Sequence, residues 1–125
     1  MRQLFLEYVT AATLFLAADF LWLRSMGPHF YAAELGRLLR ESPNLGVAVI
    51  FYLLFVAGLV VFVIHPAGPA APLVSVAAKA AFFGLVAYAT YDLTNLATIK
   101  GFSVKVAVVD MAWGAVLSAG VAAAT

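Results

Sequence analysis

Three aspartates, Asp19, Asp92 and Asp110, lie inside apolar stretches that are long enough to cross a bilayer. Hydrocarbon strips a carboxylate of its hydration, so acids in such segments usually face a protein interior or a water-filled path. Two of the three share a local pattern, Asp19-Phe-Leu-Trp22 and Asp110-Met-Ala-Trp113. Carboxyl groups in this setting can bind and release a proton or hold a cation, and we take them as the centre of the candidate site.

Helical spacing adds polar and aromatic neighbours to these acids. Around Asp92, the side chains of Tyr88 and Asn95 recur at three or four residues and so share one helical face. We expect Asp92 and Asp110 to be the main proton or cation acceptors and Asp19 to be the third. Tyr88 and Asn95 would orient these carboxyls. The walls of the pocket would be Trp22, Trp113 and Tyr91.

Three interpretations of the acids stay open at this stage. In the first, they hydrogen-bond Asn95, Tyr88 or a Trp indole and only fix helix packing. In the second, they handle a proton or a cation in binding or transport. In the third, the protein is a membrane enzyme that uses acid–base chemistry on a lipophilic substrate. The sequence favours a binding or transport protein, with a structural or accessory subunit of a membrane complex as the next alternative.

Composition indicates a membrane protein. Of the 125 residues, 66% are hydrophobic and 10% are charged, whereas soluble domains carry about 25% charged residues. The mean hydropathy is +1.06. The net charge of +1 and the absence of a basic stripe give no indication of nucleic-acid binding. Because the chain has no cysteine, disulfides, iron–sulfur clusters and thiol catalysis are excluded.

The apolar runs predict an all-α integral membrane protein, a four-transmembrane-helix bundle in a single domain over residues 1–125. A short amphipathic helix is expected in the membrane interface between spans 1 and 2, at about residues 29–41, where apolar residues recur at helical spacing. The start of span 3 is the least defined boundary. The four spans are predicted at about residues 4–23, 45–64, 73–98 and 102–123.

Lys and Arg are more frequent in the loops after spans 1 and 3, which predicts that these loops are cytoplasmic and that both termini lie outside. In that topology all three aspartates fall in the inner leaflet, at a similar depth. We expect spans 1, 3 and 4 to surround the polar centre. Span 2 carries no charged residue and its strongest polar group is Tyr52, so it is expected to pack outside, with Tyr52 as an interface or core residue.

No metal site and no cofactor is expected. The two histidines, His29 and His65, fall on opposite sides of the membrane in this topology and cannot share a metal. Sequence signatures of metalloproteases, nucleotide-binding loops and serine hydrolases are absent, so nothing in the chain indicates a catalytic residue. Glu7 is expected near the outer surface, in contact with solvent.

Gly114 and Ser118 form a small-xxx-small spacing, which allows another helix to approach closely. This face is the candidate contact for a homodimer, because four short spans make a small transport unit. Apart from the lipid bilayer, no other partner is indicated, and the ligand is unknown.

Two strings carry a family resemblance: Tyr91-Asp-Leu-Thr-Asn-Leu-Ala-Thr-Ile-Lys-Gly-Phe102 and Val109-Asp-Met-Ala-Trp-Gly114. With Asp19-Phe-Leu-Trp22, they resemble a family of small bacterial inner-membrane proteins known as predicted membrane proteins with a domain of unknown function. The resemblance extends over the whole chain and implies four spans in a bacterial inner membrane. It implies no activity, but it points to six of the residues named above: Asp19, Trp22, Asp92, Asn95, Asp110 and Trp113.

Overall fold

The computed structural model describes residues 2–26 and 45–125. Its helices are α1 (Arg2–Met26), α3 (Leu45–Leu59), the π-helical turn η3 (Val60–Ile64), α4 (His65–Ala67), α5 (Leu73–Thr98) and α6 (Val104–Ala124). The turn η3 and α4 continue the axis of α3, so these three elements form one span. The expected amphipathic helix at about residues 29–41 lies outside the described residues.

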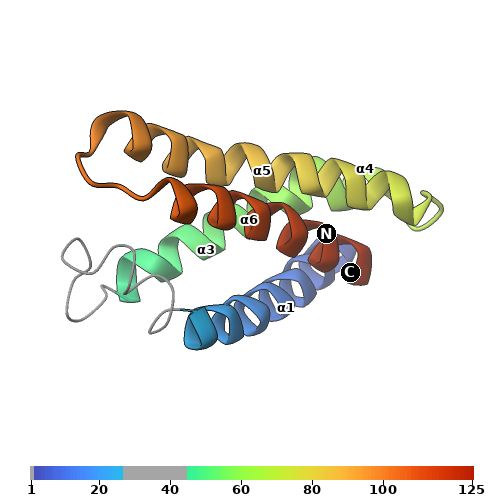
Figure 1. Cartoon of the computed structure of the whole chain (residues 1–125). Helices are drawn as coiled ribbons and strands as arrows, with labels where there is room; N and C mark the ends of the chain where they lie inside the picture. The colour runs from blue at the N-terminus through green and yellow to red at the C-terminus, as the bar shows by residue number, and fades with distance from the viewer. Residues whose placement is uncertain (1, 27–44) are drawn as a thin grey trace.

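Within the described residues, four helices are long and apolar enough to cross a membrane. The shortest has 21 residues, which gives about 31 Å at 1.5 Å per residue and matches a hydrocarbon core of about 30 Å. The helices alternate in direction, and the two termini lie close together at one end of the bundle (Figure 1). The predicted all-α membrane bundle of four spanning helices is therefore confirmed.

Local sequence explains where the helices of the second half end. Gly68 adopts a positive φ of 72° and ends α4, and Pro72 precedes the first residue of α5. Gly101 (φ 80°) turns the chain between α5 and α6. The hydroxyl of Ser103 then accepts a hydrogen bond from the backbone N–H of Val106 at 3.2 Å, which caps α6.

The second span widens into a π-helical turn at η3. There the backbone N–H of His65 bonds the carbonyl of Val60, five residues back. Pro66 follows directly, has no N–H, and its ring would clash with the carbonyl four residues earlier in an α-helix. The wider turn relieves that conflict.

The second span contributes much of the core, contrary to the expectation that it packs outside the polar centre. Phe55 packs against Phe15 of α1 at a ring-centroid distance of 5.0 Å and against Tyr88 of α5 at 5.8 Å. Val56, Leu59 and other residues of this span are buried with them. The expectation was wrong because an uncharged span is also the most apolar one and therefore packs well between the other helices.

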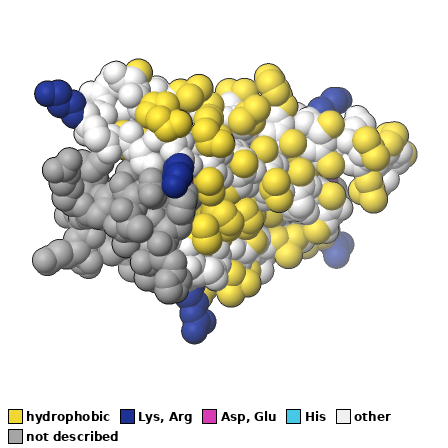
Figure 2. Space-filling model, viewed as in Figure 1, with side chains coloured by type: hydrophobic (Ala, Val, Ile, Leu, Met, Phe, Trp, Pro, Cys, Tyr) yellow, Lys and Arg dark blue, Asp and Glu magenta, His cyan; other side chains and the backbone are white. Residues whose placement is uncertain are grey.

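Much of the bundle's surface is apolar, as expected for helices that face lipid. Large side chains such as Phe20, Leu54 and Phe82 are exposed. In the face shown in Figure 2, hydrophobic side chains cover the helices, and no Asp or Glu of the described residues is visible. The acids of the spans are therefore not presented to the hydrocarbon on this face.

Candidate functional site

Asp19 joins three helices. Its Oδ1 accepts the indole N–H of Trp113 from α6 at 2.9 Å, and its Oδ2 accepts the hydroxyl of Tyr52 from α3. Asp19 itself is 5% exposed. A carboxyl that accepts at both oxygens suits the ionised, acceptor-only form. Its hydration in the unfolded chain is thus replaced by two donors supplied from other spans.

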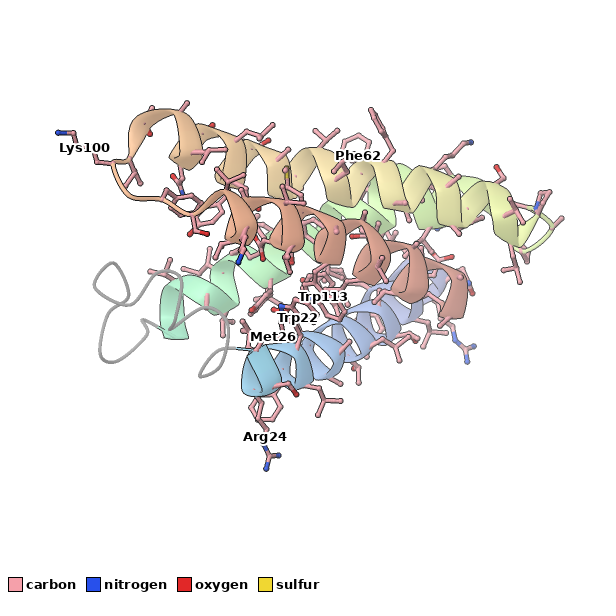
Figure 3. The ribbon with its side chains drawn as sticks, viewed as in Figure 1. Trp22, Arg24, Met26, Phe62, Lys100 and Trp113 are labelled. Carbon is pink, nitrogen blue, oxygen red and sulfur yellow. The ribbon has the colours of Figure 1, made fainter. Side chains whose placement is uncertain are left out.

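The two tryptophans of the chain lie together at this point. The rings of Trp22 and Trp113 are stacked, with centroids 4.3 Å apart and planes inclined by 7°. In Figure 3 both labelled side chains lie in the space between α1 and α6, whereas the labelled Arg24 and Lys100 point away from the bundle. The structure therefore brings Asp19, Trp22 and Trp113 together, as the repeated Asp-x-x-Trp pattern suggested.

Helices α5 and α6 form the most extensive interface in the structure. A Cβ added to Gly84 would meet the carbonyl oxygen of Gly114 and would lie 2.8 Å from Cβ of Ser118. A Cβ on Gly114 would lie 2.8 Å from Cδ2 of Tyr88. The absent side chains of these glycines let the helices approach closely, as in other membrane bundles.

The same antiparallel register brings Asp92 beside Asp110. Along α5, residues 84, 88 and 92 follow at intervals of four, and along α6 they face residues 118, 114 and 110 in turn. Asp110 also lies within electrostatic range of Tyr52 and Tyr91. The two stripes expected from helical spacing thus form a single interface.

Asp92 is the most unusual of the three acids. Its exposure is 0%, and neither of its carboxyl oxygens accepts a hydrogen bond from a hydroxyl, amide or indole group of the described residues. Buried polar groups in folded proteins are almost always bonded. Neither Tyr88 nor Asn95 bonds Asp92, although these residues were expected to orient the carboxyls. Asp110 is partly buried and is the acid next to Asp92.

The three acids lie at nearly the same depth. Asp92 is six residues before the end of α5, Asp110 six after the start of α6, and Asp19 seven before the end of α1. At 1.5 Å per residue, they lie about 9–11 Å from these helix ends, which are at the same end of the bundle (Figure 1).

The remaining predicted residues lie around the pair. Tyr88 is buried between Gly114 and the rings of Phe51 and Phe55. Tyr91 is 57% exposed and contacts Phe102 edge-on, with Asn95 beside it. Tyr91 therefore lies at the margin of the site rather than inside it.

Two features were missed from the sequence. Tyr52 belongs to the polar centre, because its hydroxyl bonds Asp19, whereas it was expected only as an interface or core residue. Glu7 bonds Nδ1 of His65 at 2.7 Å, and its side chain is 11% exposed rather than solvated. Neither contact has a local sequence signal, since the partners are 33 and 58 residues apart.

The Gly114/Ser118 face is not free to join two copies of the chain. It is covered by α5 of the same chain, and both residues are buried there. The expected dimer contact at this face is therefore wrong. Small residues at four-residue spacing predicted a close helix approach, but they could not show that the neighbour belongs to the same chain.

Within residues 2–26 and 45–125, no three His, Cys, Asp or Glu side chains come together in a way that could hold a metal ion. The polar centre consists of carboxyl groups, which can bind and release protons, and of phenol and indole groups, which donate hydrogen bonds to them. Asp19 accepts two hydrogen bonds from other helices, whereas Asp92 has none from a hydroxyl, amide or indole group of the described residues.

Comparison with known proteins gives a family and no activity. No curated protein and no solved structure matches the chain. The model of one family, described as "Predicted membrane protein (DUF2177)", matches residues 4–125. Because the match spans nearly the whole chain and includes all four helices, this four-helix membrane protein belongs to the DUF2177 family of predicted membrane proteins.

Proposed function

We propose that Asp92 and Asp110 form a proton-binding pair and that the protein couples this proton to the binding or transport of a small polar solute or cation. The observation that carries the proposal is the fully buried Asp92 carboxyl, which accepts no hydrogen bond from a hydroxyl, amide or indole group of the described residues and lies beside a second acid, Asp110. Acids inside membrane spans mark proton relays and coupling sites.

A proton suits this pair better than a resident metal ion. Hard cations such as Ca²⁺ and Mg²⁺ take six or more oxygen ligands, or keep several waters. The α5–α6 interface is too close to leave that room, because Gly84 and Gly114 already touch the facing helix. A proton needs no cavity, and two adjacent carboxyls can share one.

Asp19 has a different role in this proposal. It accepts bonds at both oxygens and so holds α1, α3 and α6 in place around the pair. Tyr52 and Trp113 position it. In this proposal Asp19 stabilises the packing of the helices, and the exchangeable proton is bound by Asp92 and Asp110.

We propose a membrane setting for the site from the distribution of charge and from the family resemblance. Arg24 and Lys100 lie at the end of the bundle nearest the acids (Figure 3). The positive-inside rule supports a cytoplasmic position for this end, which would put the pair in the inner leaflet and both termini outside. The family resemblance supports a bacterial inner membrane.

The test is proton movement in liposomes that contain the purified protein and a pH-sensitive dye. With an imposed pH gradient, we expect wild type to move protons and D92N or D110N to lose at least about 90% of this flux, because Asn keeps the shape but cannot titrate. S118A is the matched control, since Ser118 is equally buried on the same interface and should keep the wild-type flux.

Equal flux in wild type, D92N and D110N would overturn the proposal. Tryptophan fluorescence adds a local readout, because Trp113 lies about one turn after Asp110 on α6 and stacks on Trp22. A pH-dependent change in emission should be present in wild type and absent from D110N.

A structural role within a larger membrane complex is the second candidate function. The two hydrogen bonds that Asp19 accepts favour this structural role, because they act on helix packing alone. In that case D92N and D110N would lose co-purifying partner proteins, and wild-type protein would show no proton flux.

A further inference from the structure

A second pair of titratable groups lies at the opposite end of the bundle from the aspartates. His65 Nδ1 and Glu7 Oε1 are 2.7 Å apart, and Gln3 Nε2 donates to Glu7 Oε2 at 3.4 Å. The pair joins α1 to the end of the second span, near the two chain termini (Figure 1). The proposed proton-binding pair does not use it.

The side chains of the two residues differ in their exposure. The His65 side chain is 49% exposed, whereas that of Glu7 is 11% exposed. His65 is therefore open to the surroundings, and it contacts Glu7, whose side chain is mostly covered. Imidazole is also the side chain that changes charge between about pH 5 and pH 8.

Helix α1 carries an acid at each end of one buried stripe. Glu7, Ala11, Phe15 and Asp19 follow at intervals of four, and Ala11, Phe15 and Asp19 are buried. Glu7 and Asp19 are separated by about 18 Å along the helix. Each acid contacts the second span, Glu7 through His65 and Asp19 through Tyr52.

Between the two acids the contact is apolar. Phe15 lies against Phe55 at 5.0 Å and against Tyr52 at 5.6 Å. Val56 and Leu59 are fully buried in the same cluster. A proton could not cross this layer in the described arrangement, so the two polar groups are separate stations rather than parts of one open path.

We propose that Glu7 and His65 form the proton-exchange station for the second side of the membrane, with the Phe15–Phe55 layer as the barrier between it and the aspartates. This inference rests on the proposed proton function of Asp92 and Asp110. It assigns the two ends of the protein to the two aqueous phases.

Other titratable groups at this end are few. The elements packed against η3 carry Arg2 and Tyr8 on α1 and Lys79 on α5, and α6 has no titratable side chain in its neighbouring half. Arg2 and Lys79 are exposed. Tyr8 donates to the carbonyl of Leu53 at 3.1 Å. The exchangeable proton at this end is therefore assigned to His65 and Glu7.

The experiment uses full-length protein in the same dye-loaded liposomes and compares H65Q, E7Q and K79Q with wild type. Gln at position 65 can still donate to Glu7 but cannot titrate, so a merely structural pair would tolerate H65Q. We expect H65Q and E7Q to lower the flux at least about tenfold, as for lost acid–base groups. K79Q removes an exposed titratable group at the same end and should stay near wild type.

The pH profile separates a proton station from a packing contact. Wild-type flux should vary with pH between about pH 5 and pH 8, and H65Q should lose that dependence. If H65Q shows the same flux and the same pH profile as wild type while D92N remains inactive, this inference is wrong and the proposed function stands. Absence of any flux in wild type would instead remove the proposed function.

The fluorescence readout keeps the test independent of folding. Both tryptophans lie at the aspartate end, so H65Q should keep the pH-dependent emission of wild type while it loses flux. If H65Q loses both the flux and the pH-dependent emission, it has lost its fold. The flux and emission of E7Q then test the inference in its place.

Discussion

Trp113 donates its indole N–H to Asp19 at 2.9 Å across 94 residues of sequence. This bond joins the last helix to the first, and the Tyr52 hydroxyl of the second span donates to the other oxygen of Asp19. A buried carboxylate with two donors is stable in a bilayer, whereas one without donors would oppose folding. The bond joins the Asp of one Asp-x-x-Trp pattern, at Asp19, to the Trp of the other, at Trp113.

The bonds to Asp19 should be measurable as stability. We expect Y52F and W113F each to lower the free energy of unfolding by about 1–3 kcal/mol, because each leaves an oxygen of a buried carboxylate without its donor. Thermal unfolding in detergent gives the comparison. In a double-mutant cycle, Y52F should have a smaller effect in the D19L background, and full additivity would contradict the assigned bond.

Asp92 should behave in the opposite way. Because its carboxyl is buried beside a second acid and accepts no hydrogen bond from a hydroxyl, amide or indole group of the described residues, D92N should unfold at a temperature equal to or above that of wild type. D19N is the matched control and should unfold at a lower temperature. A loss of stability in D92N as large as that in D19N would show that Asp92 makes a packing bond.

The glycines of the α5–α6 interface are predicted to be intolerant of a methyl group. G84A would bring Cβ against the backbone carbonyl of Gly114, and G114A would bring it against the Tyr88 ring. We expect each change to reduce stability by about 1–3 kcal/mol through overpacking. G120A is the control, because nothing lies within 4 Å of a Cβ at Gly120. Equal stability of all three variants would contradict the close approach.

The stacked tryptophans predict a spectroscopic signature. Two indoles with centroids 4.3 Å apart and nearly parallel planes should couple and give a paired signal in the near-ultraviolet circular dichroism. W22F should abolish the paired signal, and D92N should retain it, because Asp92 is not part of the stack. A wild-type signal equal to the sum of two isolated tryptophans would contradict the stacking.

Much of the architecture could be predicted from the sequence because its physical cause is local. Apolar runs of about 20 residues determine how many helices cross the bilayer, since unsatisfied backbone groups exclude other structures there. Helical periodicity also placed Tyr88 with Asp92, and Asp110 with Gly114, on single faces. The shared depth of the three acids followed from their distance to the helix ends.

The partners of those faces depended on tertiary structure. The spacing of Gly114 and Ser118 is equally suited to a second chain or to α5, and only the fold showed that α5 covers it. The role of Tyr52 was hidden for the same reason, because nothing in an uncharged apolar span indicates which neighbour its one hydroxyl will reach.

The sequence by itself determined that this is a four-span membrane protein and which carboxyls lie within its helices, because hydrophobicity and helical periodicity act along the chain. Only the tertiary structure decided that Asp19 accepts hydrogen bonds from Tyr52 and Trp113, that Asp92 accepts none from a hydroxyl, amide or indole group of the described residues, and that Glu7 bonds His65. The physical reason is that hydrogen bonding depends on positions across helices, which are set by packing between segments far apart in the chain.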